Sequence, residues 1–200
     1  MRWFRRTPIE SARWVVLDCE TSGLDPAHDR LLSVGAIGVH AGEIRLADSF
    51  SALVGQATPS TPENILVHGI GGDAQRAGRP LAEVIAGLRA YVGDGVPVAF
   101  HAPFDAGILR RHGLRLPAGW IDLATLMPAL FPSRAPRQCT LDHWLAAFSV
   151  PAGARHDALG DAFAAAQLLL IVLAELKRQR SGTVEELIKA ERGARWLARH

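Results

Sequence analysis

Two carboxylates follow a short apolar stretch near the start of the chain. Trp14–Leu17 is apolar and rich in strand-forming residues, which predicts a buried strand, and Asp18 and Glu20 come at its end. Because side chains alternate across a strand, these two acids share one face, whereas Cys19 points to the other. Like charges so close together repel unless a cation lies between them, and oxygen ligands suit Mg²⁺ or Mn²⁺. The alternative is a strand end whose acids face water, and further acids in the chain decide between the two.

Further acids occur at two predicted helix starts. Asp105 falls in the first turn of a helix that is expected to begin at Pro103. His156 and Asp161 lie at the start of the longest predicted helix, and both can face the same side there. Each has an ordinary structural explanation when taken alone, because an acid is favoured in the first turn of a helix and a histidine beside a helix start is often a surface residue or a cap.

Together, four carboxylates and one histidine are what two-metal hydrolysis of a phosphodiester requires. Asp18 would bridge two divalent ions, and three acids would complete their ligand shells: Glu20, Asp105 and Asp161. His156 would take the proton from the attacking water, a role that suits a side chain with an ordinary pKa of about 6.5. Mg²⁺ keeps water and substrate oxygens among its ligands, so few protein ligands are enough. We therefore predict a site for two Mg²⁺ or Mn²⁺ ions.

The elements that must position these residues alternate between strands and helices. Two further strands are expected around a turn at Gly42, over Leu31–His40 and Glu43–Val54, and pairing with the first strand would give a three-stranded antiparallel start. A polar, proline-rich connection follows over Gly55–Glu63. The spacing of apolar residues then predicts four helices, over Leu81–Val92, Pro103–His112, Leu141–Phe148 and Asp157–Arg178. A buried strand is expected over Val96–Phe100, and a strand or strand-to-helix transition over Trp120–Leu126.

This order of elements predicts one α/β domain with a mixed sheet flanked by helices. A chain of 200 residues is long enough to bury a sizeable core. Residues 1–12 are a basic and aromatic lead-in, and residues 13–180 form the main domain. Residues 181–200 are expected to form a basic helix, because Thr183–Glu186 resembles a capping box.

Composition limits the classes to which the protein can belong. The 48% hydrophobic content and the net charge of +2 are typical of soluble globular proteins. Residues 15–105 carry 11 acids against 5 arginines, a net charge of −6, and basic segments flank them, as suits a metal site that handles a polyanion. Two cysteines form no disulfide framework, and Leu168–Ala174 is far shorter than the 20 or so apolar residues that span a bilayer. We expect a cytoplasmic protein with no membrane partner.

The three segments that contain the candidate catalytic residues resemble the signature of one enzyme family. The motifs D-x-E-T and H-x-A-x-x-D correspond here to Asp18–Thr21 and His156–Asp161. The motif H-x-x-x-F-D corresponds to His101–Asp105, which has one residue fewer between the His and the Phe. Over roughly residues 13–178 the chain is thereby similar to the DEDDh exonucleases of the ribonuclease H-like superfamily, especially those like the proofreading (epsilon) subunit of DNA polymerase III. The resemblance implies a ribonuclease H-like mixed five-stranded sheet flanked by helices. It also implies metal-dependent 3′→5′ removal of nucleoside 5′-monophosphates.

The resemblance extends to the residues that would hold a nucleic acid 3′ end. These substrate-binding positions are Thr21, Ser22, Gly23, Leu24, His68, Ile70, His101 and Phe104. Leu24 would lie beside the terminal base, with Ile70 and Phe104 in the same pocket. The chain departs from the family pattern at Ala102, where many members carry Asn.

Three functions fit this signature. Single-stranded DNA is the expected substrate of a 3′→5′ exonuclease of this kind, with a polymerase as the partner that the resemblance suggests. An RNA exonuclease of the oligoribonuclease or ribonuclease T type would use the same chemistry, and a contact to the 2′-OH would distinguish it. An accessory subunit that binds 3′ ends for a polymerase without cleaving them is the third, and the intact set of five residues argues against it.

Overall fold

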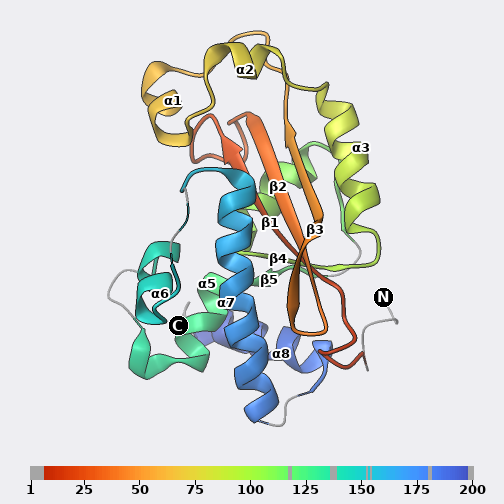
Figure 1. Ribbon diagram of the computed structural model, residues 1–200, viewed down its shortest axis with the longest axis vertical. Helices are drawn as coiled ribbons and strands as arrows, with labels where there is room; N and C mark the ends of the chain where they lie inside the picture. The colour runs from red at the N-terminus through yellow and green to blue at the C-terminus, as the bar shows by residue number, and fades with distance from the viewer. Residues whose placement is uncertain are drawn as a thin grey trace.

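A five-stranded mixed sheet in the order β3-β2-β1-β4-β5 forms the centre of the protein (Figure 1). The computed structural model describes residues 7–116, 119–135, 139–151, 153, 155–179 and 182–197. The central strand β1 (Trp14–Thr21) pairs antiparallel with β2 (Leu31–His40), which pairs antiparallel with β3 (Glu43–Leu53). On its other side β1 runs parallel to β4 (Val96–Ala99), and β4 parallel to β5 (Ile121–Asp122). The predicted α/β class and the antiparallel start are confirmed.

Helices cover both faces of this sheet. The long helix α7 (Ala158–Arg178) crosses one face, and three other helices pack on the same core: α5 (Leu123–Leu130), α6 (Leu141–Ala147) and α8 (Val184–Leu197). The opposite face is covered by α3 (Leu81–Val92) and α4 (Ala102–Arg111). A short 3₁₀ helix, η1 (Pro132–Arg134), follows α5. The sheet is therefore buried on both sides, which is why its central strands are apolar at nearly every position.

Strand β1 divides its side chains between the two cores. Trp14 and Val16 belong to the core under α7, whereas Leu17 and Cys19 belong to the core under α3 and α4. By the same alternation, Asp18 and Glu20 continue the row of side chains that faces α7. The prediction that Cys19 points away from the two acids is confirmed.

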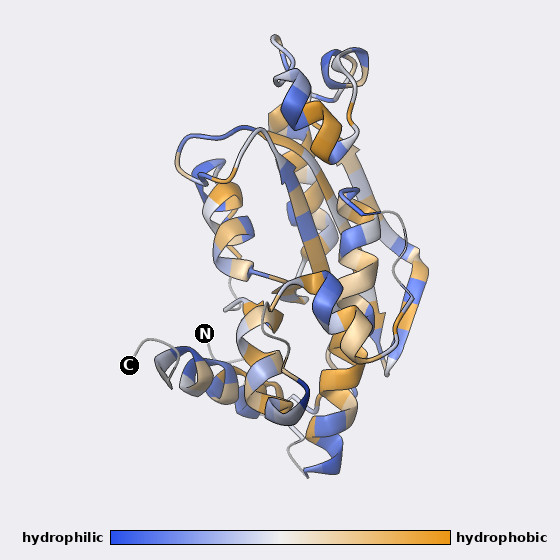
Figure 2. Ribbon diagram, turned by 90° about the vertical axis from the view of Figure 1, so that its left-hand side faces the viewer, coloured by the Kyte–Doolittle hydropathy of each residue, from blue (hydrophilic) through white to orange (hydrophobic). Residues whose placement is uncertain are grey.

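Helix α7 is the core helix that the sequence predicts. Among the described helices it is the one long and apolar enough to cross a membrane, but 56% of its most apolar window is buried inside the protein. Figure 2 shows it apolar over most of its length and hydrophilic at its C-terminal end. Its apolar surface is thus covered by β1 and β2 and by the helices beside it.

Two helices beyond β3 were not predicted from the sequence. Both α1 (Pro62–His68) and α2 (Gly72–Arg76) lie after the proline-rich connection, above the end of the sheet at which β1 finishes (Figure 1). Helices of seven and five residues are too short to give a clear apolar period. They depend on capping and on tertiary contacts, such as the Thr61 side chain that accepts a hydrogen bond from the Asn64 N–H.

The segment before β1 lies beside the residues that lead into α8. The N–H of Ile9 donates to the Gly182 carbonyl, and the N–H of Val184 donates to the Thr7 carbonyl, both at 3.0 Å. Ile9 and Val184 also share the core beneath α7. The predicted capping box is present, because Glu186 accepts from the Thr183 N–H at 2.9 Å. Residues 1–6, 181 and 198–200 of the predicted end segments lie outside the described residues.

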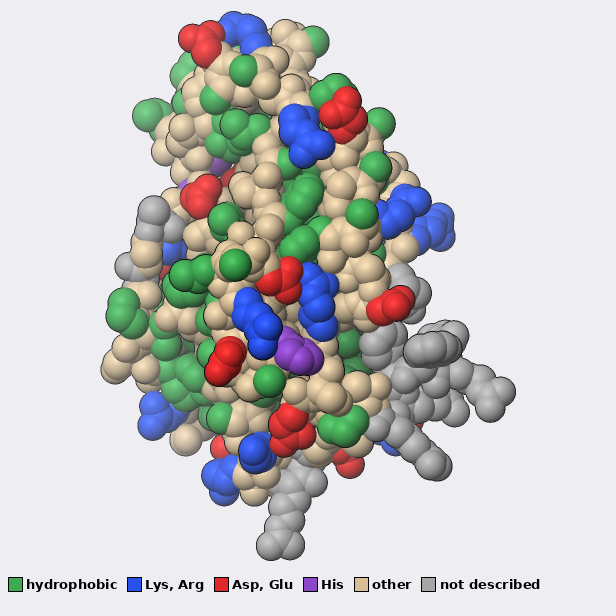
Figure 3. Space-filling view, turned by 45° about the vertical axis from the view of Figure 1, so that its right-hand side comes forward, with side chains coloured by type: hydrophobic (Ala, Val, Ile, Leu, Met, Phe, Trp, Pro, Cys, Tyr) green, Lys and Arg blue, Asp and Glu red, His purple; other side chains and the backbone are tan. Residues whose placement is uncertain are grey.

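Charges of both signs are mixed on the face that carries α3 and β3. Figure 3 shows basic and acidic side chains interspersed among the described residues there. The described residues in that view therefore form no continuous basic surface for a polyanion.

Candidate active site

The predicted catalytic residues come from three elements that meet at the carboxyl end of β1. Asp18 and Glu20 are the last acids of that strand, and Asp105 is in the first turn of α4. Asp161 is in the first turn of α7, and His156 lies just before the N-cap Asp157. Asp105 and Asp161 are only 2% and 6% exposed, while Asp18 and Glu20 are partly exposed and His156 is exposed. The cluster is thus buried where α4 and α7 contribute Asp105 and Asp161, and it is accessible to solvent at His156.

Gly35 allows α7 to come this close to β1. It is the residue of β2 that pairs with Asp18. A Cβ atom at position 35 would collide with the backbone of Ala158 and Leu159, in the first turn of α7. Because glycine has no Cβ, the start of α7 can rest directly on the sheet beside the acidic residues.

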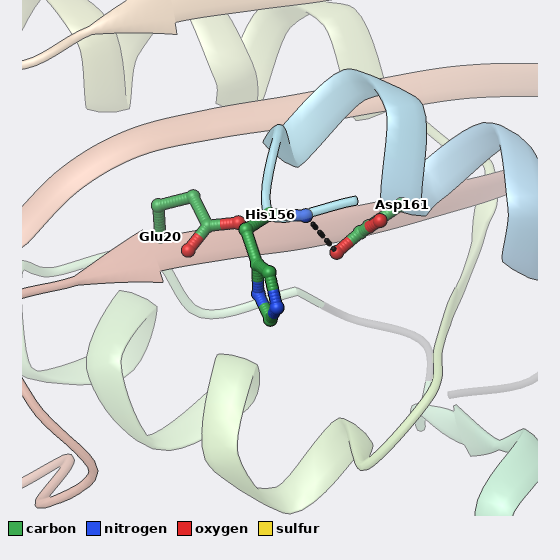
Figure 4. A group of neighbouring side chains, drawn as sticks. All are labelled: Glu20, His156 and Asp161. Carbon is green, nitrogen blue, oxygen red and sulfur yellow. Dashed lines mark hydrogen bonds between the residues drawn. The ribbon is translucent and has the colours of Figure 1, made fainter. Parts of the chain in front are cut away.

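Glu20, His156 and Asp161 form a compact group with potential metal ligands. Each offers one ligand atom, and these atoms all lie within 4.8 Å of one another. Figure 4 shows the three side chains at the start of α7, with His156 between the two acids. The backbone N–H of His156 donates to Asp161 Oδ2 at 3.2 Å, which ties this residue to the helix. The group includes His156, which we predicted as a base rather than a ligand, and does not include Asp18 or Asp105.

Burial and mutual repulsion disfavour the charged forms of the carboxyls. Desolvation raises the pKa of Asp18 well above its ordinary value, and the charges of Asp105 and Glu20 add to the effect. Burial raises the pKa of Asp105 to about 8. The pKa of Glu20 is raised to about 6, again mainly by burial and then by the charge of Asp157. Carboxyls with raised pKa values in an accessible cluster are typical of a functional site.

Arg155 supplies a positive charge to this cluster. Its guanidinium forms an ion pair with the Asp161 carboxylate, and its Nε donates to Asp142 Oδ1 at 2.5 Å. The charge of Arg155 also acts to lower the pKa values of Asp18 and Glu20. Arg155 therefore offsets part of the repulsion, although its single positive charge faces the four proposed ligand acids.

The cluster fits divalent cations of the Mg²⁺ or Mn²⁺ type. Its donors are mainly carboxylate oxygens, which such ions prefer. Burial and neighbouring charges raise the pKa values of Asp18, Glu20 and Asp105, so a bound cation would favour their charged forms. The group of Glu20, His156 and Asp161 is compact enough to share an ion.

Asp105 is held against β1 from the other face of the sheet. Its carboxylate accepts hydrogen bonds from the backbone N–H and the thiol of Cys19, and these bonds oppose the rise in its pKa. Cys19 therefore links Asp105 to the strand that carries Asp18 and Glu20, although its own side chain points away from them.

The last residue of β1 and the turn after it carry four of the predicted substrate-binding residues, at positions 21–24. Thr21 Oγ1 donates to the Gly23 carbonyl at 2.5 Å, and Ser22 Oγ donates to Asp29 Oδ1 at 2.9 Å. Both hydroxyls are thus used to shape the turn. Leu24, at the tip of this turn, is 90% exposed, which leaves its side chain free to contact another molecule.

His68 has a structural position in the same region. It is 4% exposed, and its Nδ1 accepts from the Ile70 N–H at 2.9 Å. Its Nε2 then donates to Asn64 Oδ1 at 2.9 Å, and Asn64 Nδ2 donates to the Thr21 carbonyl at 3.2 Å. Burial lowers the pKa of His68, which favours this neutral ring. A buried ring can hold Ile70 and Thr21 in place more readily than it can touch a base.

The start of α4 brings His101 and Phe104 to the site. His101 is exposed with a left-handed backbone, φ = 69°, and Phe104 is partly buried. Ala102, the departure from the family pattern, is fully buried in the core under α3 and α4. Its side chain is therefore covered by apolar residues of that core.

Three residues of the site were missed in the sequence. Arg155 and Asn64 make contacts that no spacing rule anticipates, because these depend on how α1 packs on β1 and on how the segment before α7 folds onto that helix. Asp122 is different: it is the last residue of the short strand β5 and is buried, and a carboxylate at a strand end directly before a helix is a recognisable N-cap signal.

Comparison with known sequences identifies the family. The sequence profile of the exonuclease family (RNase_T) matches residues 15–169. A DNA polymerase III subunit epsilon-like protein of Rhodobacter capsulatus is 31% identical over 177 residues, which are 86% of this chain and 25% of that protein. A PolC-type DNA polymerase III of Thermotoga petrophila is 28% identical over 175 residues, 85% of this chain and 12% of that protein. The chain thus spans a quarter or less of the length of these relatives.

Solved structures share the fold. A zinc-bound complex of E. coli exonuclease I with single-stranded DNA superimposes with a TM-score of 0.72 at 21% identity, over 84% of this chain and 42% of that one. Exonuclease X in complex with 5′-overhanging duplex DNA gives a TM-score of 0.71 at 23% identity, over 89% of this chain and 99% of that one. The predicted ribonuclease H-like sheet is confirmed by these likenesses. The chain belongs to the exonuclease family, as a DEDDh-type member of the ribonuclease H-like superfamily.

Proposed function

We propose that this protein is a metal-dependent 3′→5′ exonuclease that releases nucleoside 5′-monophosphates from single-stranded DNA. The observation that carries the proposal is the convergence of β1, α4 and α7. They bring together acids whose pKa values are raised by burial and by one another's charge, next to the exposed His156. The exonuclease family generally depends on divalent metal, and the cluster suits such ions.

The acids would hold two Mg²⁺ or Mn²⁺ ions. The proposed ligands are Asp18, Glu20, Asp105 and Asp161. Such ions supply electrostatic stabilisation of the attacking and leaving oxygens of the phosphodiester. Burial of Asp105 and Asp161 excludes water from the inner side of the cluster, so that their charges act in a medium of low dielectric constant.

His156 would accept the proton of the attacking water. It lies on the exposed side of the cluster, and its ring is within 4.8 Å of a carboxylate oxygen of Glu20 and of Asp161. These acids would stabilise the imidazolium that forms when the ring nitrogen takes the proton. The bond from its backbone N–H to Asp161 would keep it at this position while the side chain remains free to turn.

An apolar contact would hold the terminal base. Leu24 is exposed at the tip of the turn after β1, and Ile70 and Phe104 are partly exposed. Stacking and apolar contacts of this kind tolerate any base and contribute about 1–3 kcal/mol per base. Thr21 and Ser22 would act through the shape of the turn, and His68 through its bonds to Ile70 and Asn64.

Single-stranded DNA is proposed as the substrate because the similar proteins and structures are described as acting with DNA. Two of them are described as DNA polymerase III proteins, and the exonuclease I structure holds single-stranded DNA. The same names favour a polymerase partner and a cytoplasmic location, both of which belong to this proposal. An RNA exonuclease of the oligoribonuclease type is the second candidate, since the five proposed catalytic residues would serve either substrate.

Digestion of labelled single strands tests the proposal. Linear DNA and RNA of one sequence are incubated with the protein and Mg²⁺, with a free or a phosphorylated 3′ end, and compared with circular single-stranded DNA. The proposal predicts stepwise shortening of 5′-labelled DNA, faster than RNA, and none of DNA with a 3′-phosphate. Efficient cleavage of the circles would identify an endonuclease and refute it.

A further inference from the structure

Asp122 joins the first turns of two helices through one carboxylate. It ends β5 and caps α5, and it is only 4% exposed. Its Oδ1 accepts from the backbone N–H of His101 at 3.1 Å and of Ala102 at 3.3 Å, both at the start of α4. The same oxygen accepts from the Ala124 N–H at 3.2 Å, and Oδ2 accepts from Thr125 Oγ1 at 2.7 Å, both in α5.

The bonds to α4 act at a strained point of the backbone. His101 has a left-handed conformation, φ = 69°, which costs energy in a residue that carries a Cβ. Such a conformation persists only when the surroundings hold it in place. The backbone N–H of His101 and the next N–H, that of Ala102, both donate to Asp122, so the strained residue is held on either side of its Cα atom. Asp105 follows in the first turn of the same helix.

We propose that Asp122 is a positioning residue for hydrolysis, which acts by fixing the start of α4 and thereby the place of Asp105 in the acidic cluster. The inference rests on the proposed exonuclease function for its catalytic consequence. The link that Asp122 makes between the starts of α4 and α5, which we call the clamp, rests on four hydrogen bonds. Two further features agree with it. The charge of Asp122 acts to raise the pKa of Asp105, and Asp105 is bonded to β1 through the Cys19 N–H.

Three variants separate the clamp from an ordinary helix cap. Asp122→Ser keeps a residue that caps α5 well, but its short hydroxyl cannot reach His101 and Ala102. Asp122→Asn keeps an oxygen that can accept the same N–H bonds, and its amide can donate to Thr125. Thr125→Val is the matched control, because it removes the bond to Oδ2 and leaves those to α4.

The variants are compared by kcat, KM, melting temperature and hydrogen exchange over residues 99–106. Exchange is measured on the metal-free protein, so that it does not depend on activity. Asp122→Ser is expected to lower kcat about 10²-fold with KM little changed, since a shift of about 1 Å at a catalytic group has that effect. It should also speed exchange at His101 and Ala102. Asp122→Asn should restore the rate and the slow exchange, and Thr125→Val should keep the wild-type kcat.

Two results would overturn the proposal. One is wild-type kcat and slow exchange at His101 and Ala102 in folded Asp122→Ser. The other is an equal loss of rate in Asp122→Asn, with exchange unchanged, which would assign the effect to the charge of Asp122 instead. If the wild-type protein itself shows no nuclease activity, the proposed function fails, while the exchange comparison still tests the clamp.

Discussion

Asp18 pairs with Gly35 across β1 and β2, and the first turn of α7 rests on the open face of that glycine. This relationship places the helix that carries Asp161 beside the strand that carries Asp18. The proposed site therefore depends on a residue with no side chain and no chemistry of its own.

Gly35→Ala should lower activity by moving α7. The new methyl group would meet the backbone of Ala158 and Leu159, which cannot turn aside as a side chain could. Overpacking of this kind costs about 1–3 kcal/mol, and misplacement of Asp161 should reduce kcat about 10²-fold. Gly193→Ala in α8 is the control, because among the described residues nothing beyond its own helical turn and chain neighbours lies within 4 Å of a Cβ there. Equal kcat values for the two variants would show that α7 is not held by this contact.

The metal-free protein should lose stability as the pH rises. Burial raises the pKa of Glu20 to about 6 and of Asp105 to about 8, against about 4 for carboxyls in an unfolded chain. Between these values the folded protein binds more protons than the unfolded one, so the free energy of unfolding falls with rising pH. Denaturant titrations at pH 5, 7 and 9 in EDTA measure this directly.

Two comparisons assign that loss to the site. Asp105→Asn can still accept from the Cys19 N–H but has no charge, so it should flatten the fall between pH 7 and 9. Saturating Mg²⁺ should reduce the fall in the wild type, because a bound cation favours the ionised acids. Stability that is constant or increasing from pH 5 to 9 in EDTA would contradict the raised pKa values.

Much of this arrangement could be predicted because it is local in the sequence. The period-two alternation of β1 placed Asp18 and Glu20 on one face and Cys19 on the other, as the structure has them. The capping box over Thr183–Glu186 located the start of α8, where Glu186 accepts from the Thr183 N–H.

Other features could not be predicted because they depend on contacts distant in the chain. Helices α1 and α2 are held by bonds such as those of Asn64 to Thr21 and of Gln75 to Ser60. The pairing of Arg155 with Asp161 arises only when the segment before α7 folds onto that helix. The roles of the five proposed catalytic residues remain predictions.

Leu24→Ala should weaken substrate binding without affecting the fold. Its side chain is 90% exposed, so truncation removes no core contact. Loss of a base contact worth about 1–3 kcal/mol should raise KM about tenfold or more. Leu46→Ala on β3 is a matched control, since Leu46 is 69% exposed on another element. An equal KM for the two variants in digestion of single-stranded DNA would remove Leu24 from the substrate site.

Arg155→Gln should make the metal-free protein less stable and bind metal more tightly. Removing the guanidinium leaves Asp161 without its ion pair, at a cost of about 1–3 kcal/mol. The same change removes a positive charge that competes with a cation for that carboxylate. Titration calorimetry with Mn²⁺ and thermal melts in EDTA measure the two effects.

Arg178→Gln provides the control for that experiment. Arg178 forms an exposed pair with Glu175 near the end of α7, so its loss should leave Mn²⁺ affinity unchanged. Weaker Mn²⁺ binding in Arg155→Gln than in Arg178→Gln would mean that Arg155 supports the cation instead of competing with it.

Release of nucleoside 5′-monophosphates by wild-type protein and by Asp18→Ala tests the central claim most directly. Both proteins are incubated with Mg²⁺ and single-stranded DNA, and their melting temperatures are compared in EDTA. The wild type should release monophosphates from the 3′ end, and Asp18→Ala should release essentially none. The variant should be at least as stable without metal, because it lacks one of the repelling acids. Unchanged turnover in Asp18→Ala would contradict the proposed site.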